Sequence, residues 1–219
     1  MTWVAPDVER SEHYPERRNA SEREMLRDWL DWHRATLLRK CAGLDATQLA
    51  KRAVPPSSLS LLGLVRHMSD TERGWVRQTY RGEQIPDLYY RPDARDADFE
   101  EIDPARAEED FECYRAECRA VDAALDGANL DDTFTFSEQT LSVRWMWQHL
   151  VEEYARHNGH ADLIRQVIDG SVGCCGTTWP GSAMTSRPPP RSRRSARSRA
   201  TDSRSGVRRY DVTCARRRA

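Results

Sequence analysis

Apolar residues recur at helical spacing between Ser142 and Gly170, and this pattern restricts the fold more than any other part of the sequence. They return every three or four positions, the period of one helix face: Met146, Trp147, Leu150, Val151, Tyr154, Ala161, Ile164 and Ile168. Ser142 suits the N-cap, and Gly170 suits the position after the last turn. The segment therefore predicts a long amphipathic helix with one buried face.

Three earlier segments show the same periodicity. They are bounded by a Ser21/Glu24 capping box and Gly43, by Pro56 and Gly82, and by Asp103-Pro104 and Gly127. A short alternating stretch at residues 133–136 predicts a small hairpin. Four amphipathic helices predict an all-α fold, an up-down four-helix bundle. A long loop, residues 83–102, joins helices two and three, and loops of this length are more often functional or covering than idle.

The charge is divided unevenly along the chain. Residues 171–219 hold 12 Arg and 2 Asp, although the whole chain has a net charge of −1, so the remainder is acidic. The basic part is rich in Arg, Ser and Pro with almost no aliphatic residues, and it cannot bury enough surface to offset its ordering entropy. We expect an N-terminal arm at residues 1–20, the bundle at 21–170 and a disordered tail at 171–219.

The tail has two explanations. Its arginines could attract nucleic acid, or it could be a non-native extension without function. Only Trp179 and Tyr210 are available to stack on bases, and no recognisable nucleic-acid module is present. We favour the extension, and we expect no specific nucleic-acid partner.

Neither a membrane span nor an export signal is visible in the sequence. No apolar run approaches the roughly 20 residues that cross a bilayer, and the charged start lacks the apolar centre of a signal peptide. Six cysteines without a CxxC pair are typical of reduced thiols. We expect a cytoplasmic protein with no membrane partner.

A candidate metal site combines residues of the second and fourth predicted helices. Glu153 and His157 are four residues apart, so they lie on one helix face, one turn apart. His67 is the best candidate for a third ligand from a neighbouring helix. Three protein ligands leave one coordination position open, which distinguishes catalytic zinc-type sites from closed structural ones.

Ordinary structural roles compete with this interpretation. The ridge formed by His149, Glu153, His157 and His160 could be a solvated helix face. His67 could simply bond to a neighbouring carboxylate, for which Asp70 and Glu72 are the nearest in sequence. Arg66, Arg144 and Arg156 could bind an anionic substrate, but each is equally well explained as helix surface.

The layout resembles the DinB superfamily of metal-binding bundles, with the closest likeness to an actinobacterial branch of mini-circle-like proteins of unknown function. The resemblance covers about residues 2–170 and is carried by DWHRATLLRKCAGL, VPPSSLSLLGLVRHM, ERGWVRQ and EEYARHNGHADLIR. It implies a four-helix bundle that holds a divalent metal, usually zinc or nickel, through three side chains. The mycothiol-dependent maleylpyruvate isomerase of the same superfamily is similar in using a His, Glu, His set, which maps onto His67, Glu153 and His157.

The resemblance also implies a chemistry. Many relatives have His in place of Glu153 and Gln in place of His160, and we assign His160 a catalytic role in which it orients a ligand or binds substrate. Relatives include transferases and isomerases that use a low-molecular-weight thiol such as mycothiol on a small electrophile, so we expect a thiol co-substrate and a small-molecule substrate. A non-catalytic metal-binding or stress-response bundle is the alternative. Relatives are often dimeric, which makes a homodimer the expected assembly.

Overall fold

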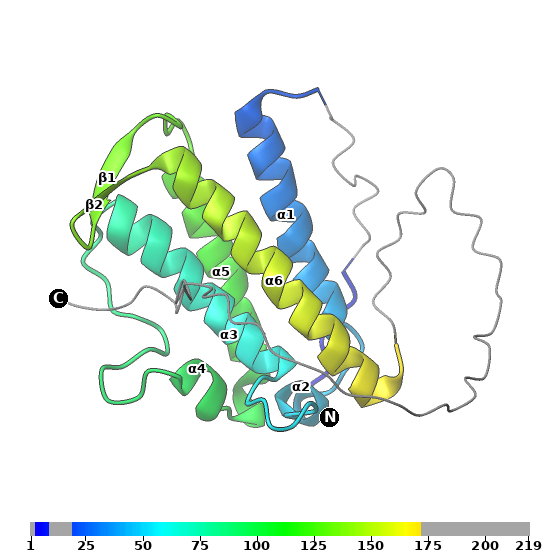
Figure 1. Ribbon diagram of the computed structural model, residues 1–219. Coiled ribbons are helices and arrows are strands. Elements are labelled where there is room, and N and C mark those ends of the chain that lie inside the picture. Colours follow the sequence, from blue (N-terminus) through cyan, green and yellow to red (C-terminus); the bar gives the residue numbers. More distant parts are fainter. Residues whose placement is uncertain (1–2, 9–18, 172–219) are drawn as a thin grey trace, which may run out of the picture. The chain divides into compact units, whose positions relative to one another are not determined.

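Four long helices form a bundle in the computed structural model, which describes residues 3–8 and 19–171 (Figure 1). Helix α6 lies against α1 and α3, and α3 also packs on α5. These helices are α1 (Glu22–Cys41), α3 (Leu61–Glu72), α5 (Ala107–Leu125) and α6 (Val143–Asp169). The predicted all-α bundle is confirmed.

Local capping signals determine where these helices begin and end. The Ser21 side chain accepts a hydrogen bond from the backbone N–H of Glu24, whose carboxylate accepts from the Ser21 N–H at 3.0 Å. Ser142 caps α6 by accepting from the Trp145 N–H. Gly170 ends α6 with a φ of 78°, a left-handed conformation that a residue without a Cβ adopts at little cost. The helix ends were predicted from these same residues.

The core lies where the four helices face one another. It is built from large side chains that are almost fully buried, and burial of each contributes about 1.5–3 kcal/mol relative to exposure. The largest are Trp147, Tyr114, Tyr154, Phe111, Leu30, Leu37, Leu49, Leu61, Leu62, Leu64, Met68 and Leu125.

Helix α3 continues without a break into η1 (Arg73–Tyr80), a π-helix. A π-helix has a wider turn than an α-helix, and such segments often occur at functional sites. The predicted second helix therefore reaches as far as expected, but its last two turns have a different geometry. Trp75 lies in this part and packs against Phe136 of the hairpin and Trp145 of α6.

Shorter elements complete the bundle. They are α2 (Ala46–Ala50), α4 (Ala97–Glu100), the 3₁₀-helix η2 (Pro104–Arg106), and the strands β1 (Thr133–Phe136) and β2 (Gln139–Ser142). The two strands pair antiparallel around a turn at Ser137 and Glu138, both with positive φ, so the predicted hairpin is confirmed. Helices α2 and α4 were not predicted, because four or five residues are too few to reveal a helical period.

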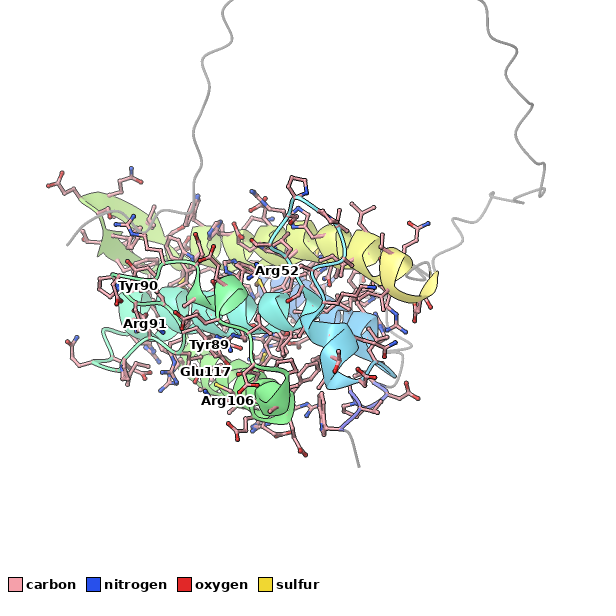
Figure 2. All side chains as sticks on the ribbon, turned by 90° about the horizontal axis from the view of Figure 1, so that it is seen from below. Arg52, Tyr89, Tyr90, Arg91, Arg106 and Glu117 are labelled. Carbon is pink, nitrogen blue, oxygen red and sulfur yellow. The ribbon has the colours of Figure 1, made fainter. Side chains whose placement is uncertain are left out.

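Residues 83–102, the predicted long loop, join η1 to η2 and α5 and are called the connecting segment below. Polar contacts hold this segment against α3. The Asp70 carboxylate accepts hydrogen bonds from the backbone N–H groups of Leu88, Tyr89 and Tyr90, at 2.8, 3.0 and 3.0 Å. Figure 2 views this side of the molecule from below, with Tyr89, Tyr90 and Arg91 labelled along the segment. The connecting segment therefore has a defined path across the bundle, and α4 is part of it.

Other sequence predictions concern the ends of the chain and its surroundings. The predicted tail lies outside the described residues, except for Ser171, as does most of the N-terminal arm. Across residues 3–8 and 19–171, no helix has both the length and the apolar character needed to span a bilayer. Cys41, Cys113 and Cys118 are free thiols, as expected, and burial raises the pKa of the Cys41 thiol to about 12. A cytoplasmic location stays a prediction.

Candidate metal centre

Helices α3 and α6 bring His67, Glu153 and His157 together. Each offers one ligand atom, and the three atoms all lie within 4.8 Å of one another. The rings of His67 and His157 meet edge to face with centroids 4.7 Å apart, and Glu153 Oε2 lies 3.4 Å from His157 Nε2. His157 is buried, and the other two are half-buried. The three residues named from the sequence thus form one cluster.

His67 forms a hydrogen bond to a carboxylate that the sequence did not single out. Its Nδ1 lies 2.7 Å from Oδ2 of Asp98, in helix α4. The expectation of Asp70 or Glu72 as the partner was wrong, because those carboxylates are already used by the connecting segment and by Arg34. An ionised carboxylate only accepts, so Nδ1 of His67 is the donor, and in the neutral form of the ring Nε2 then keeps a lone pair.

His157 has an analogous neighbour in His160, one turn further along α6. The two Nδ1 atoms lie 3.4 Å apart, a long hydrogen bond in which one ring must donate. His157 Nε2 faces the Glu153 carboxylate, which can only accept, so in a neutral His157 the Nε2 atom donates to Glu153 and Nδ1 accepts from His160. His160 therefore contacts the cluster through His157, which fits the orienting role among the two roles considered for it.

The electrostatics of the cluster favour the protonation states that a metal needs. The hydrogen bond with His157 lowers the pKa of Glu153 despite partial burial, so its carboxylate is ionised at neutral pH. Burial lowers the pKa of His157, which keeps its imidazole neutral. A carboxylate and neutral imidazoles are the forms in which these side chains bind divalent ions.

A second group, His149, Glu152 and Glu153, also has ligand atoms within 4.8 Å of one another. All three come from two successive turns of α6, and Glu152 is paired with Arg156. The His149 ring stacks on Trp145 and meets Trp75 edge to face, with centroids 5.0 and 4.9 Å apart. Glu153 belongs to both groups, since its Oε1 lies 3.9 Å from His149 Nε2. The first group is the better centre, because two helices enclose it and a carboxylate supports His67.

The three arginines considered as substrate ligands already have partners. Arg66 is buried rather than on the surface, and its guanidinium lies over the Tyr89 ring, 4.1 Å from the centroid. Arg144 pairs with Glu22 and Asp131, and Arg156 pairs with Glu152. These contacts favour a structural role for each arginine.

The donor set fits a tetrahedral divalent ion. Nitrogen and oxygen ligands about 2.0–2.2 Å from such an ion stand about 3.3–3.6 Å apart from one another. The 3.4 Å between Glu153 Oε2 and His157 Nε2 lies in this range. The remaining ligand-atom separations are no larger than 4.8 Å, and three protein ligands would leave the fourth position of a tetrahedral ion to another ligand.

Comparison with known families gives a match that spans the bundle. Residues 25–170 match a family described as mycothiol-S-transferase, from the first turn of α1 to the residue that ends α6. This family is DinB-like, so the predicted place of the chain in the DinB superfamily is confirmed. Comparison with curated proteins and with solved structures found no match.

Proposed function

The chain belongs to the mycothiol S-transferase family, and on that premise we propose that it is a divalent-metal-dependent transferase that joins a low-molecular-weight thiol to a small electrophile. The family match supports a mycothiol-related transferase, while the metal dependence, the ligand residues and the substrate class are parts of the proposal. Zinc and nickel are the expected ions, because both accept imidazole and carboxylate ligands.

The observation that carries this proposal is the cluster of His67, Glu153 and His157. Two neutral imidazoles and one carboxylate give three ligands of the type found in catalytic zinc sites, with one position available to an exchangeable ligand. A divalent ion held there would favour the thiolate form of a bound thiol, which is the reactive nucleophile.

The surrounding residues would keep the ligands in place and leave the reaction itself to the thiol. With an ion in place of the His157 Nε2 proton, His157 would donate its Nδ1–H to His160, which would hold the ring with Nε2 toward the cluster. The three described cysteines, Cys41, Cys113 and Cys118, are poor nucleophiles, because burial raises the pKa of each thiol. In the proposed step the attacking sulfur is that of the thiol substrate. As the S–C bond forms, the electrophile's leaving group departs with the electron pair of its bond to carbon, and the S–H proton passes to that group or to water.

Metal binding is the first test. The purified full chain should bind about one zinc or nickel ion per molecule, and the His67→Ala, His157→Ala double variant should lose it, since one ligand cannot hold the ion. Gly159→Ala is a matched control, because a Cβ at Gly159, on the same helix, meets no atom within 4 Å. Equal metal content in the double variant and the wild type would contradict the assignment.

Turnover is the second test. Metal-loaded protein should accelerate conjugation of mycothiol to a panel of small electrophiles, and His157→Ala should remove the acceleration while Gly159→Ala keeps it. X-ray absorption on the loaded protein should show three protein ligands and a fourth that exchanges with solvent. If His149 or His160 completes a closed shell of four protein ligands, the transferase proposal fails, and a non-catalytic metal-binding bundle is the remaining function.

A further inference from the structure

The Asp98 side chain of the connecting segment forms a hydrogen bond to His67, one of the three residues of the His67, Glu153, His157 cluster. It lies in α4, 31 positions after His67 in the sequence, and both partners are largely shielded from solvent. A hydrogen bond from an imidazole N–H to a carboxylate fixes the orientation and tautomer of the ring. Asp98 therefore determines which nitrogen His67 presents to the cluster.

Gly63 allows helix α4 to approach α3 closely enough for this contact. A Cβ added at Gly63 would lie 2.7 Å from Phe99 Cδ1 and 3.4 Å from the carbonyl oxygen of Asp98. The first distance is shorter than real side chains tolerate, so any larger residue must displace Phe99 or the backbone of α4. Phe99 in turn packs against the His67 ring, with centroids 5.1 Å apart.

Two arginines hold the backbone of α4 at this distance from α3. Arg66, one residue before His67, donates to the Ala97 carbonyl at 3.0 Å. Arg52 donates to the carbonyls of Phe99 and Glu100, at 3.1 and 3.3 Å, and is labelled beside α4 in Figure 2. The carbonyls on both sides of Asp98 are thus held, which limits the movement of its side chain.

We propose that Asp98 is the positioning residue for His67 and that Gly63 fixes the distance at which it acts. The proposal rests on the proposed function, because it assumes that His67 is a metal ligand. Asp98 accepts the Nδ1–H of His67 and thereby keeps the Nε2 lone pair directed at the metal position. Helix α4 is then a support for the metal centre, carried by a segment whose sequence shows no helical period.

The affinity for zinc tests this role directly. Loss of a hydrogen-bonding partner behind a metal ligand lowers metal affinity about 10–100-fold. Asp98→Ala should therefore raise the Kd for zinc by this factor, measured on the full chain by competition with a chromophoric chelator. Asp98→Asn keeps an oxygen that can accept from Nδ1–H, so it should retain more of the affinity than alanine does. Asp93→Ala is the control, since Asp93 is an exposed carboxylate of the same segment.

A cobalt spectrum separates positioning from a general loss of stability. The visible absorption of Co²⁺ at the site reports the geometry of its ligands, so Asp98→Ala and Gly63→Ala should both alter it. Gly159→Ala, which adds a Cβ in open space on α6, should not. Thermal melting of the metal-free proteins shows whether each variant still folds. If Asp98→Ala does not fold, the near-isosteric Asp98→Asn variant is used for the same comparison.

Each result decides the proposal. If Asp98→Ala binds zinc as tightly as the wild type and has the same cobalt spectrum, the proposal for Asp98 is overturned. The proposed function would still stand in that case, because the wild type binds metal. A wild-type protein that binds no divalent ion would remove both. An effect of Asp98→Ala without an effect of Gly63→Ala would keep Asp98 and overturn the role of Gly63.

Discussion

Arg34 of α1 and Glu72 at the end of α3 form an ion pair inside the bundle, with Arg34 Nε donating to Glu72 Oε1 at 2.8 Å. A second bond joins Arg34 Nη2 to Glu72 Oε2, and the Tyr154 hydroxyl also donates to Glu72. Glu72 is fully buried, so neither charge can be left alone without a large desolvation cost. The pair links three helices at the point where α3 passes into η1.

Removing one partner of this pair should destabilise the protein strongly. Arg34→Met leaves the Glu72 carboxylate buried without its cation, and we expect a loss of about 3–5 kcal/mol in the free energy of unfolding. The Arg34→Met, Glu72→Met double variant should lose less, because no uncompensated charge is left. Urea denaturation measures both. Additive losses would contradict this account. Arg144→Met, which removes only exposed ion pairs, is the control and should cost much less than Arg34→Met.

Stability should decrease in mild acid because of His33. Burial lowers the pKa of His33 to about 4 from the usual 6.5, so between these values the unfolded chain binds a proton that the folded chain does not. The free energy of unfolding is therefore highest above about pH 6.5 and falls toward pH 4, on the order of 2 kcal/mol after allowance for residual solvent contact. His33→Gln should flatten this dependence in urea titrations. An unchanged slope would show that other groups cause it.

Substitutions at Glu153 should distinguish the two overlapping ligand groups. Glu153→His retains a zinc-binding side chain beside His157, so it should keep about one ion per chain, whereas Glu153→Ala should weaken binding. Glu152→Ala should leave the affinity unchanged if the ion lies between His67 and His157. A loss in Glu152→Ala as large as that in Glu153→Ala would place the ion at the second group instead. Isothermal titration with zinc gives all three affinities.

A chain that ends at Ser171 should fold as the full chain does. Helix α6 has its own C-terminal stop at Gly170, and the family match ends at the same residue. The core residues of the described part run from Ala5 to Ile164, so the truncation removes none of them. We expect the same helical circular dichroism and a melting temperature within about 2 °C. A larger fall would show that residues 172–219 stabilise the bundle.

The sequence predicts the features of this protein that are encoded locally. Ser21 with Glu24, Ser142 and Gly170 each act within one helical turn, so the helix ends follow from a few neighbouring residues. Glu153 and His157 could be assigned to one face by helix geometry alone. The choice of His67 as their neighbour depended on the four-helix bundle that the helical periodicity predicted.

The partner of His67 could not be predicted in the same way. Asp98 lies in a segment without periodicity, and nothing in its own neighbourhood points toward α3. Its position depends on close packing at Gly63 and on backbone carbonyls that accept from Arg66 and Arg52. These contacts depend on tertiary structure. The glycine early in a predicted apolar helix was the available signal, since glycine there is unfavourable unless another element packs closely.

The three backbone N–H groups bound by Asp70 have a consequence for how the site responds to its ligand. They tie the connecting segment to α3 near His67, so the order of that segment and the geometry behind His67 are coupled. Coupling of this kind is reciprocal. If order in the connecting segment raises the affinity for the metal by some factor, bound metal favours the ordered state of the segment over the open state by the same factor. Zinc should therefore slow proteolytic cleavage at residues 83–102, a region far in sequence from Glu153 and His157.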